Sequence, residues 1–256
     1  MKSLRIVVSE LWYQQLAYWR NPVSAFFTFF MPVMFLVIFA SLYGNAHYDN
    51  SSLRLDQYFI PGIMTFGVIS ACYTNLAITL STQREQGILK RFRGTPLPPW
   101  AYMVVTVLNS VLRALLLVAI TLGVGVAFYH FDFPSRAFAP LVMVVVLGSA
   151  TFCALGVAVT VLIPNADAAP AVVNGVYLPL MFISGTFFPL SSSSVLAKIA
   201  LYFPIRPFIL SSFNTLDPRL ATSSINAAWL YNLAIWLVVA LVFSIRRFTW
   251  LPRRRS

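Results

Sequence analysis

The stretch Phe138–Leu162, FAPLVMVVVLGSATFCALGVAVTVL, decides the fold class of this chain. It contains no charged side chain, and it exceeds the roughly 20 apolar residues that a helix needs to cross a hydrocarbon core of about 30 Å. Its apolar residues run continuously and do not alternate with period two, which favours a helix over a membrane strand. We therefore predict a membrane-spanning helix here.

Similar stretches occur on both sides of this one. Each reaches or approaches the length of a span without an acidic residue. The predicted spans are Val23–Tyr43, Tyr58–Leu80, Trp100–Phe128, Phe138–Leu162, Ala168–Phe188 and Ile225–Ile245. The expected fold is an all-α integral membrane protein with six transmembrane helices.

The composition agrees with a membrane protein and excludes several other classes. Of the 256 residues, 59% are hydrophobic and only 10% are charged, whereas a soluble domain carries about 25% charged residues. Lys and Arg number 18 against 7 acidic residues, and on so apolar a chain this excess indicates loops beside an anionic leaflet and no nucleic-acid partner. Cys72 and Cys153 lie inside apolar runs without metal-ligand spacing, so no metal site is expected.

The positive charges are divided unequally between the two sets of loops. One set carries twelve Lys and Arg residues and the other carries five. The positive-inside rule assigns the richer set to the cytoplasm. Both termini are therefore predicted to be cytoplasmic, in a multi-pass protein of the cell membrane.

Two regions have a predicted structure other than a span. In residues 1–22, apolar side chains that include Trp12 and Trp19 recur at spacings of three and four or their multiples, which predicts an amphipathic helix in the membrane interface. Residues 23–256 form the six-span domain. Within it, the outer region 189–224 contains two apolar pieces of about nine residues, too short to cross a bilayer. We expect short re-entrant helices there, with ordinary surface helices as the alternative.

The predicted spans hold no Asp, Glu or His, the residues on which proton-coupled transporters usually depend. The chain also has no GxxxxGK[ST] phosphate loop and no HExxH or GxSxG motif. We therefore expect a transport subunit without catalytic residues, driven by another chain. Arg113 is the one cation inside a span: it is either a ligand for an anionic substrate or a gate, or it reaches the cytoplasmic headgroups from a helix longer than the hydrocarbon core.

Residues 81–99 form the most polar segment on the predicted cytoplasmic side. Ser81–Arg93 is expected to form a short helix with an apolar stripe of Ile88, Leu89 and Phe92, ending at Gly94. The prolines that follow predict a stiff re-entry into the membrane. Such a helix is suited to transmit force from a docked partner, and a simple positively charged anchor is the alternative.

The segment Gln83–Leu97, QREQGILKRFRGTPL, resembles the loop of type-2 ATP-binding-cassette (ABC) exporter permeases, particularly the daunorubicin/doxorubicin-resistance group. Tyr58–Gly62, YFIPG, and Ser184–Pro189, SGTFFP, are also similar to sequences of that family, and the resemblance extends over nearly the whole chain. It implies a permease that works with a second permease copy or paralogue and with two ABC ATPase subunits. ATP and Mg²⁺ are then expected on the ATPase, and no cofactor is expected on this chain.

The resemblance also implies two sets of site residues. In that family the interfacial helix and the loop helix dock the ATPase, and the translocation path runs between two permeases, mainly along the second and fifth spans. The ATPase-coupling residues would be Trp12, Trp19, Arg84, Glu85, Ile88, Leu89, Lys90, Phe92 and Thr95. The substrate path would be lined by Phe66, Ser70, Tyr73, Thr74, Asn75, Asn174, Tyr177, Met181 and Phe182.

The leading functional hypothesis is the membrane subunit of an ATP-driven exporter of hydrophobic or amphipathic, drug-like compounds. Aromatic and Met side chains with occasional amides suit such adaptable ligands. Two alternatives stay open: a permease that exports a lipid or a lipid-linked polysaccharide, and an ion-coupled secondary transporter whose ion is held by carbonyls of a broken helix. Ordinary helix packing is the alternative role for each residue of the predicted path.

Overall fold

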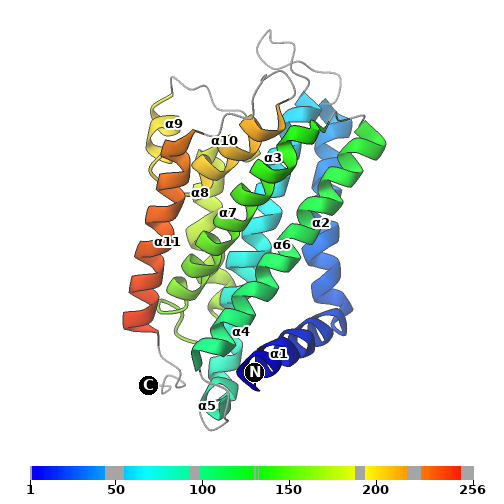
Figure 1. Cartoon of the computed structure of the whole chain (residues 1–256). Coiled ribbons are helices and arrows are strands. Elements are labelled where there is room, and N and C mark those ends of the chain that lie inside the picture. The colour runs from blue at the N-terminus through cyan, green and yellow to red at the C-terminus, as the bar shows by residue number, and fades with distance from the viewer. Residues whose placement is uncertain are drawn as a thin grey trace.

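The computed structural model describes residues 2–43, 55–92, 99–129, 131, 133–187, 194–217 and 226–248, and every regular element in these ranges is helical (Figure 1). Within them, five helices are long and apolar enough to span a membrane. They are α2 (Pro22–Tyr43), the continuous helix made of α3 (Leu55–Ile69), η1 (Ser70–Thr74) and α4 (Asn75–Glu85), then α6 (Pro99–Tyr129), α7 (Phe138–Val159) and α11 (Ala227–Arg247). The prediction of an all-α membrane protein is confirmed.

The predicted fifth span corresponds to a shorter helix, α8 (Ala169–Ser184). Its 16 residues rise about 24 Å at roughly 1.5 Å per residue. The helix ends before the predicted boundary because Gly185 adopts a φ of 81°, a left-handed conformation that terminates helices and that glycine adopts without a steric cost. The predicted last residue, Phe188, lies outside the described residues.

The shorter helices gather at the two ends of the bundle (Figure 1). α1 (Lys2–Trp19) runs obliquely across one end, where α5 (Ile88–Phe92) also lies, while α9 (Val195–Ala200) and α10 (Ile205–Leu216) lie at the opposite end. A single 3₁₀ turn, η2 (Ser135–Ala137), leads into α7. α1 packs against α6 and α2, so its two flanking neighbours determine which of its faces stays exposed.

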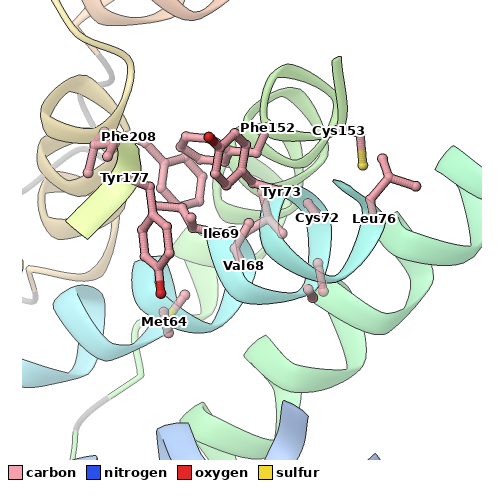
Figure 2. Packing of buried hydrophobic residues seen from close by; sticks show 14 of the residues in the cluster. Met64, Val68, Ile69, Cys72, Tyr73, Leu76, Phe152, Cys153, Tyr177 and Phe208 are labelled. Carbon is pink, nitrogen blue, oxygen red and sulfur yellow. The ribbon is translucent and has the colours of Figure 1, made fainter. Parts of the chain in front are cut away.

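The second span contains a π-turn at η1, in which the backbone N–H of Asn75 donates to the Ser70 carbonyl. A π-turn holds one residue more than an α-turn and therefore rotates the helix faces that follow it. Tight packing surrounds the turn, because a Cβ added to Gly156 of α7 would lie 2.9 Å from the Tyr73 carbonyl oxygen. Figure 2 shows this part of the core, where Cys72 and Tyr73 of η1 lie near Phe152 and Cys153 of α7.

The region predicted to hold re-entrant or surface helices contains α9 and α10. α10 packs against α3, α7, α8 and α11, and most of its side chains are buried, so it is not an ordinary surface helix. Arg206 is buried and donates from Nη1 to the Ser184 carbonyl at 3.1 Å. A cation at the carboxyl end of α8 satisfies a carbonyl that the helix leaves unpaired.

Candidate coupling and transport sites

The predicted loop helix is two helices in the structure. α4 continues from the second span to Glu85, and α5 begins at Ile88. Gly87 separates them with a φ of 70°, and its N–H donates to the Arg84 carbonyl. The prediction of one helix over Ser81–Arg93 is therefore wrong, because the positive φ at Gly87 ends the helix before the expected stop at Gly94.

Arg84 was expected to contact an ATPase partner, and the structure places it inside the chain instead. Only 3% of its surface is exposed. Its Nη1 donates to the Thr160 carbonyl at 3.0 Å and its Nη2 donates to the Ile163 carbonyl at 2.7 Å. These carbonyls follow the end of α7, where helix carbonyls lack partners and a cation is stabilised.

Glu85 takes part in the same junction from the next position. Its carboxylate accepts the backbone N–H of Ala166, in the connection between α7 and α8. Arg84 and Glu85 together therefore join the end of the second span to the α7–α8 connection.

The predicted apolar docking stripe of Ile88, Leu89 and Phe92 is not an exposed face in the described residues. Leu89 is fully buried in this chain, and Ile88 is half-buried. The exposed residues of the segment are polar: Gln86, Lys90 and Arg91. The side chain of Phe92 and all of Thr95 lie outside the described residues. Gln86 and Arg91 are absent from the predicted coupling set, and the glycine after Gln86 is the sequence signal that could have indicated their exposure.

On α1, Trp12 and Trp19 lie on the exposed side, with 66% and 49% of their surfaces accessible. The ring of Trp19 stacks on Phe29 of α2 with 5.4 Å between the ring centroids. The opposite face of α1 is polar but does not face water, because Gln14 accepts a hydrogen bond from the Asn109 amide of α6 at 3.0 Å. The amphipathic pattern is thus present, with protein against its polar side.

Two residues of the predicted substrate path meet in the core. Tyr73 of η1 and Tyr177 of α8 are both buried, with 5.9 Å between their ring centroids in an edge-on arrangement. They border an apolar cavity of about 300 Å³. Its other lining residues include Ile69, Phe152, Leu155, Ala158, Phe203 and Trp236. We call it the apolar cavity; it lies between η1, α7, α8 and α11.

The other residues of the predicted substrate path do not line the apolar cavity. Met181 is fully buried in the core, and Asn174, Ser70 and Thr74 are half-buried. Phe66 and Phe182 both contact Phe187, with centroid distances of 5.8 and 5.5 Å. Asn75 lies apart from all of these, in a polar cavity beside α1 and α6.

The two short motifs at the ends of the second and fifth spans meet each other. A Cβ added to Gly62, in YFIPG, would clash with the Thr186 carbonyl oxygen of SGTFFP. Phe39 of α2 connects the same two segments, since its ring contacts those of Phe59 and Phe187. The two motifs therefore meet in one close contact between α3 and the end of α8.

The structure is thus a multi-pass helical bundle in which these two motifs are in contact. The amino-acid sequence of residues 7–214 matches the family "ABC-2 type transporter". The chain belongs to this family. A daunorubicin resistance ABC transporter permease protein, DrrB1, of Streptomyces coeruleorubidus is 30% identical over 195 residues, which cover 72% of this chain and 65% of that protein. The inner membrane transport permease YadH of Escherichia coli strain K12 is 24% identical over 158 residues, covering 62% of this chain and 61% of that permease.

Membership of the ABC-2 family confirms the resemblance found in the sequence and defines the class of protein. The chain is a multi-pass membrane protein of this family. The aligned regions span less than two thirds of the length of these two relatives.

Proposed function

We propose that this chain is the permease subunit of an ATP-driven exporter that moves hydrophobic or amphipathic compounds out across the cytoplasmic membrane. The observation that carries this proposal is the apolar cavity beside Tyr73 and Tyr177. Its lining consists of aliphatic and aromatic side chains and Pro204, which suits an apolar ligand through the hydrophobic effect.

Aromatic rings of Tyr73 and Tyr177 form part of the lining. The Tyr73 hydroxyl, which has no hydrogen-bond partner in the described part of the chain, is buried inside the protein and does not reach the cavity surface. The cavity therefore offers its cargo apolar and aromatic contacts. The Streptomyces coeruleorubidus relative is named as a daunorubicin resistance permease, which supports the drug-like class.

The proposed assembly contains two ATPase subunits, which bind ATP and Mg²⁺, and a second permease copy or paralogue. The exposed Gln86, Lys90 and Arg91 would form the docking surface, with Arg84 and Glu85 transmitting the motion to the α7–α8 connection. The exposed apolar side of α8, which includes Val176 and Phe182, supplies area for the second permease. The charge distribution supports an orientation in which both termini and α5 face the cytoplasm.

Export of a lipid or of a lipid-linked polysaccharide is the second candidate. The apolar cavity accommodates acyl or isoprenoid chains as well as drug-like rings. A glycan needs many hydrogen-bond partners, and the side chains that line this cavity supply few. The lining thus favours a small hydrophobic or amphipathic cargo over a glycan.

The partner can be tested by purifying the tagged full-length chain from its native membrane in a mild detergent and identifying the proteins that accompany it. We expect a Walker-motif ATPase. Lys90→Glu together with Arg91→Glu should reduce its recovery at least several-fold, whereas Arg246→Glu with Arg247→Glu, the same charge change on exposed residues of α11, should not. Unchanged recovery with the first pair would contradict the proposed docking surface.

The activity can be tested with inverted membrane vesicles that contain the assembled transporter and a fluorescent amphipathic dye. ATP-dependent uptake that resists an ionophore supports the proposal. Uptake that continues without ATP and stops with the ionophore would select the ion-coupled alternative. Transport of a lipid-linked glycan with no transport of any dye would select the second candidate.

A further inference from the structure

A second cavity, of about 250 Å³, lies between α1, α4 and α6, and we call it the polar cavity. All of its lining residues except Ala17 and Leu76 carry a hydrogen-bonding side chain. Asn75 and Thr79 contribute from α4, Ser110 and Arg113 from α6, and Gln14 and Tyr18 from α1. The cavity therefore differs in chemistry from the apolar cavity of the proposed transport path.

The position of Arg113 places this cavity at the level of the lipid headgroups. Its guanidinium lies over the ring of Tyr18, 4.1 Å from the centroid, and Tyr18 is in the last turn of α1, just before α2 begins at Pro22. α6 has 31 residues and is therefore about 46 Å long, longer than a hydrocarbon core of about 30 Å. Arg113 can thus lie near the middle of its helix and still reach the membrane surface.

The charge of Arg113 is only partly compensated within the protein. In the described residues its Nε has no hydrogen-bond partner, and no carboxylate is paired with it. Burial raises the pKa of the Tyr18 phenol, so the ring under the guanidinium stays neutral and offers only its π face. Arg113 lines the polar cavity, and an anion there would compensate the charge of the guanidinium through charge-assisted hydrogen bonds.

We propose that the polar cavity binds the phosphate of an anionic phospholipid headgroup from the inner leaflet. Arg113 would hold the phosphate, and the Asn75 amide nitrogen can donate to it. The hydroxyls of Thr79 and Ser110 donate to Asn75 Oδ1 and to the Thr106 carbonyl, so their oxygens can accept hydrogen bonds from a glycerol headgroup. Basic pockets between transmembrane helices on the cytoplasmic side bind such headgroups in this way, and the planar guanidinium suits phosphate oxygens.

The outer surface of α1 fits the rest of the lipid. Val8, Trp12, Leu16 and Trp19 are exposed and lie on one arc of the helix, at spacings of three and four residues. Acyl chains can lie against this arc while the headgroup enters beside Ala17. A bound lipid would join α1 to α4, the helix that leads into α5. The inference does not depend on which compound the protein transports.

The test uses the delipidated full-length chain in detergent, with lipid binding followed by native mass spectrometry. The probes are phosphatidylglycerol, phosphatidylcholine and inorganic phosphate, each titrated separately. We expect the wild-type chain to prefer phosphatidylglycerol over phosphatidylcholine about tenfold. Arg113→Gln should abolish this preference, and Arg113→Lys should retain part of it, because the charge stays while the planar fork is lost.

Two further variants separate binding from folding. Ala17→Phe places a ring at an exposed position that borders the cavity, so it should block the headgroup without disturbing the core, and it should reduce phosphatidylglycerol binding about tenfold. Arg246→Gln removes an exposed charge from α11 and should leave binding unchanged. Equal binding by the wild-type chain, Arg113→Gln and Ala17→Phe, or equal binding of the two lipids by the wild-type chain, would overturn the proposal. Binding of inorganic phosphate without retention of phosphatidylglycerol would also overturn it, in favour of a free anion as the ligand.

Discussion

The two cavities border the same membrane-spanning helix and have opposite chemistry. The apolar cavity touches this helix at Ile69 and Tyr73, and the polar cavity touches it at Asn75, Thr79 and Gln83. Between the two sets lies the end of the η1 π-turn, which changes the direction of the side chains that follow. The neighbours differ too, since α7, α8 and α11 surround the first cavity and α1 and α6 surround the second. One helix thus serves two sites because its turn and its partners change along its length.

The largest expected effect comes from breaking the contact that holds the π-turn. Gly156→Leu would push its side chain into the Cys72 and Tyr73 carbonyl oxygens, which a mere Cβ would already approach to 3.1 and 2.9 Å. We expect loss of the folded protein, measured as loss of the monodisperse peak in fluorescence-detected size-exclusion chromatography. Gly123→Leu is the matched control, because a Cβ at Gly123 has no neighbour within 4 Å. A normal peak for Gly156→Leu would show that the contact does not hold the turn.

The next largest difference is expected between substitutions of two arginines. Arg84 donates hydrogen bonds to backbone carbonyls, and Arg113 lines the polar cavity. Arg84→Gln removes the guanidinium donors of the Thr160 and Ile163 carbonyls, and the Thr160 carbonyl keeps only the Ile163 N–H. We expect it to lower the free energy of unfolding by about 2 to 4 kcal/mol. Arg113→Gln removes no hydrogen bond of that kind and should change stability by less than about 1 kcal/mol. Thermal unfolding of both variants in the same detergent measures the difference. Equal destabilisation would mean that Arg113 is a structural residue.

A smaller effect is expected from filling the apolar cavity. Ala158 borders it from α7, and Ala158→Phe should lower dye transport about tenfold while the ATPase still co-purifies, because the ring occupies space needed by the cargo. Ala150→Phe is the control, since Ala150 lies on the same helix but borders a different groove. Initial rates of uptake in inverted vesicles measure the effect. Equal rates for Ala158→Phe and the wild type would remove the cavity from the transport path.

The smallest effect concerns the Tyr73 hydroxyl. Tyr73→Phe removes a buried hydroxyl that lacks a partner among the described residues, so we expect stability to stay the same or to rise by less than about 1 kcal/mol. The hydroxyl does not reach the cavity surface, so transport of dyes with a hydrogen-bonding oxygen and of purely apolar dyes should both stay unchanged. Parallel uptake measurements with both kinds of dye test this. A decrease confined to the dyes with a hydrogen-bonding oxygen would contradict the burial of the hydroxyl.

The sequence predicted the spans well and the sites only in part. Continuous apolar runs identify α2, α6, α7 and α11 because few structures other than a membrane helix bury so many apolar residues in a row. The same runs do not reveal which face of a helix meets protein, because lipid is as apolar as the protein core. The family resemblance assigned Asn75 to the same path as Tyr73, and the structure places the two residues beside different cavities.

The coupling segment illustrates the same limit. Its residues identify the ABC-2 family, but the pattern around Ile88 and Leu89 is equally consistent with a face that docks a partner and with one that packs inward. The conformation of Gly87 resolves this by ending α4 and directing Leu89 into the core. The family resemblance assigned Arg84 to the ATPase-coupling residues, and only the nearby end of α7 shows why it is buried.

The sequence alone was enough to indicate a helical membrane protein of the ABC-2 family. The length of an apolar run and the presence of a short motif can both be read from residues that are adjacent in the chain. The pairing of Arg84 with α7, the meeting of Gly62 with Thr186 and the two cavities beside the second span depend on residues far apart in the chain. Such contacts follow from how the helices pack, and a helix that is apolar on every side does not specify its own packing partners.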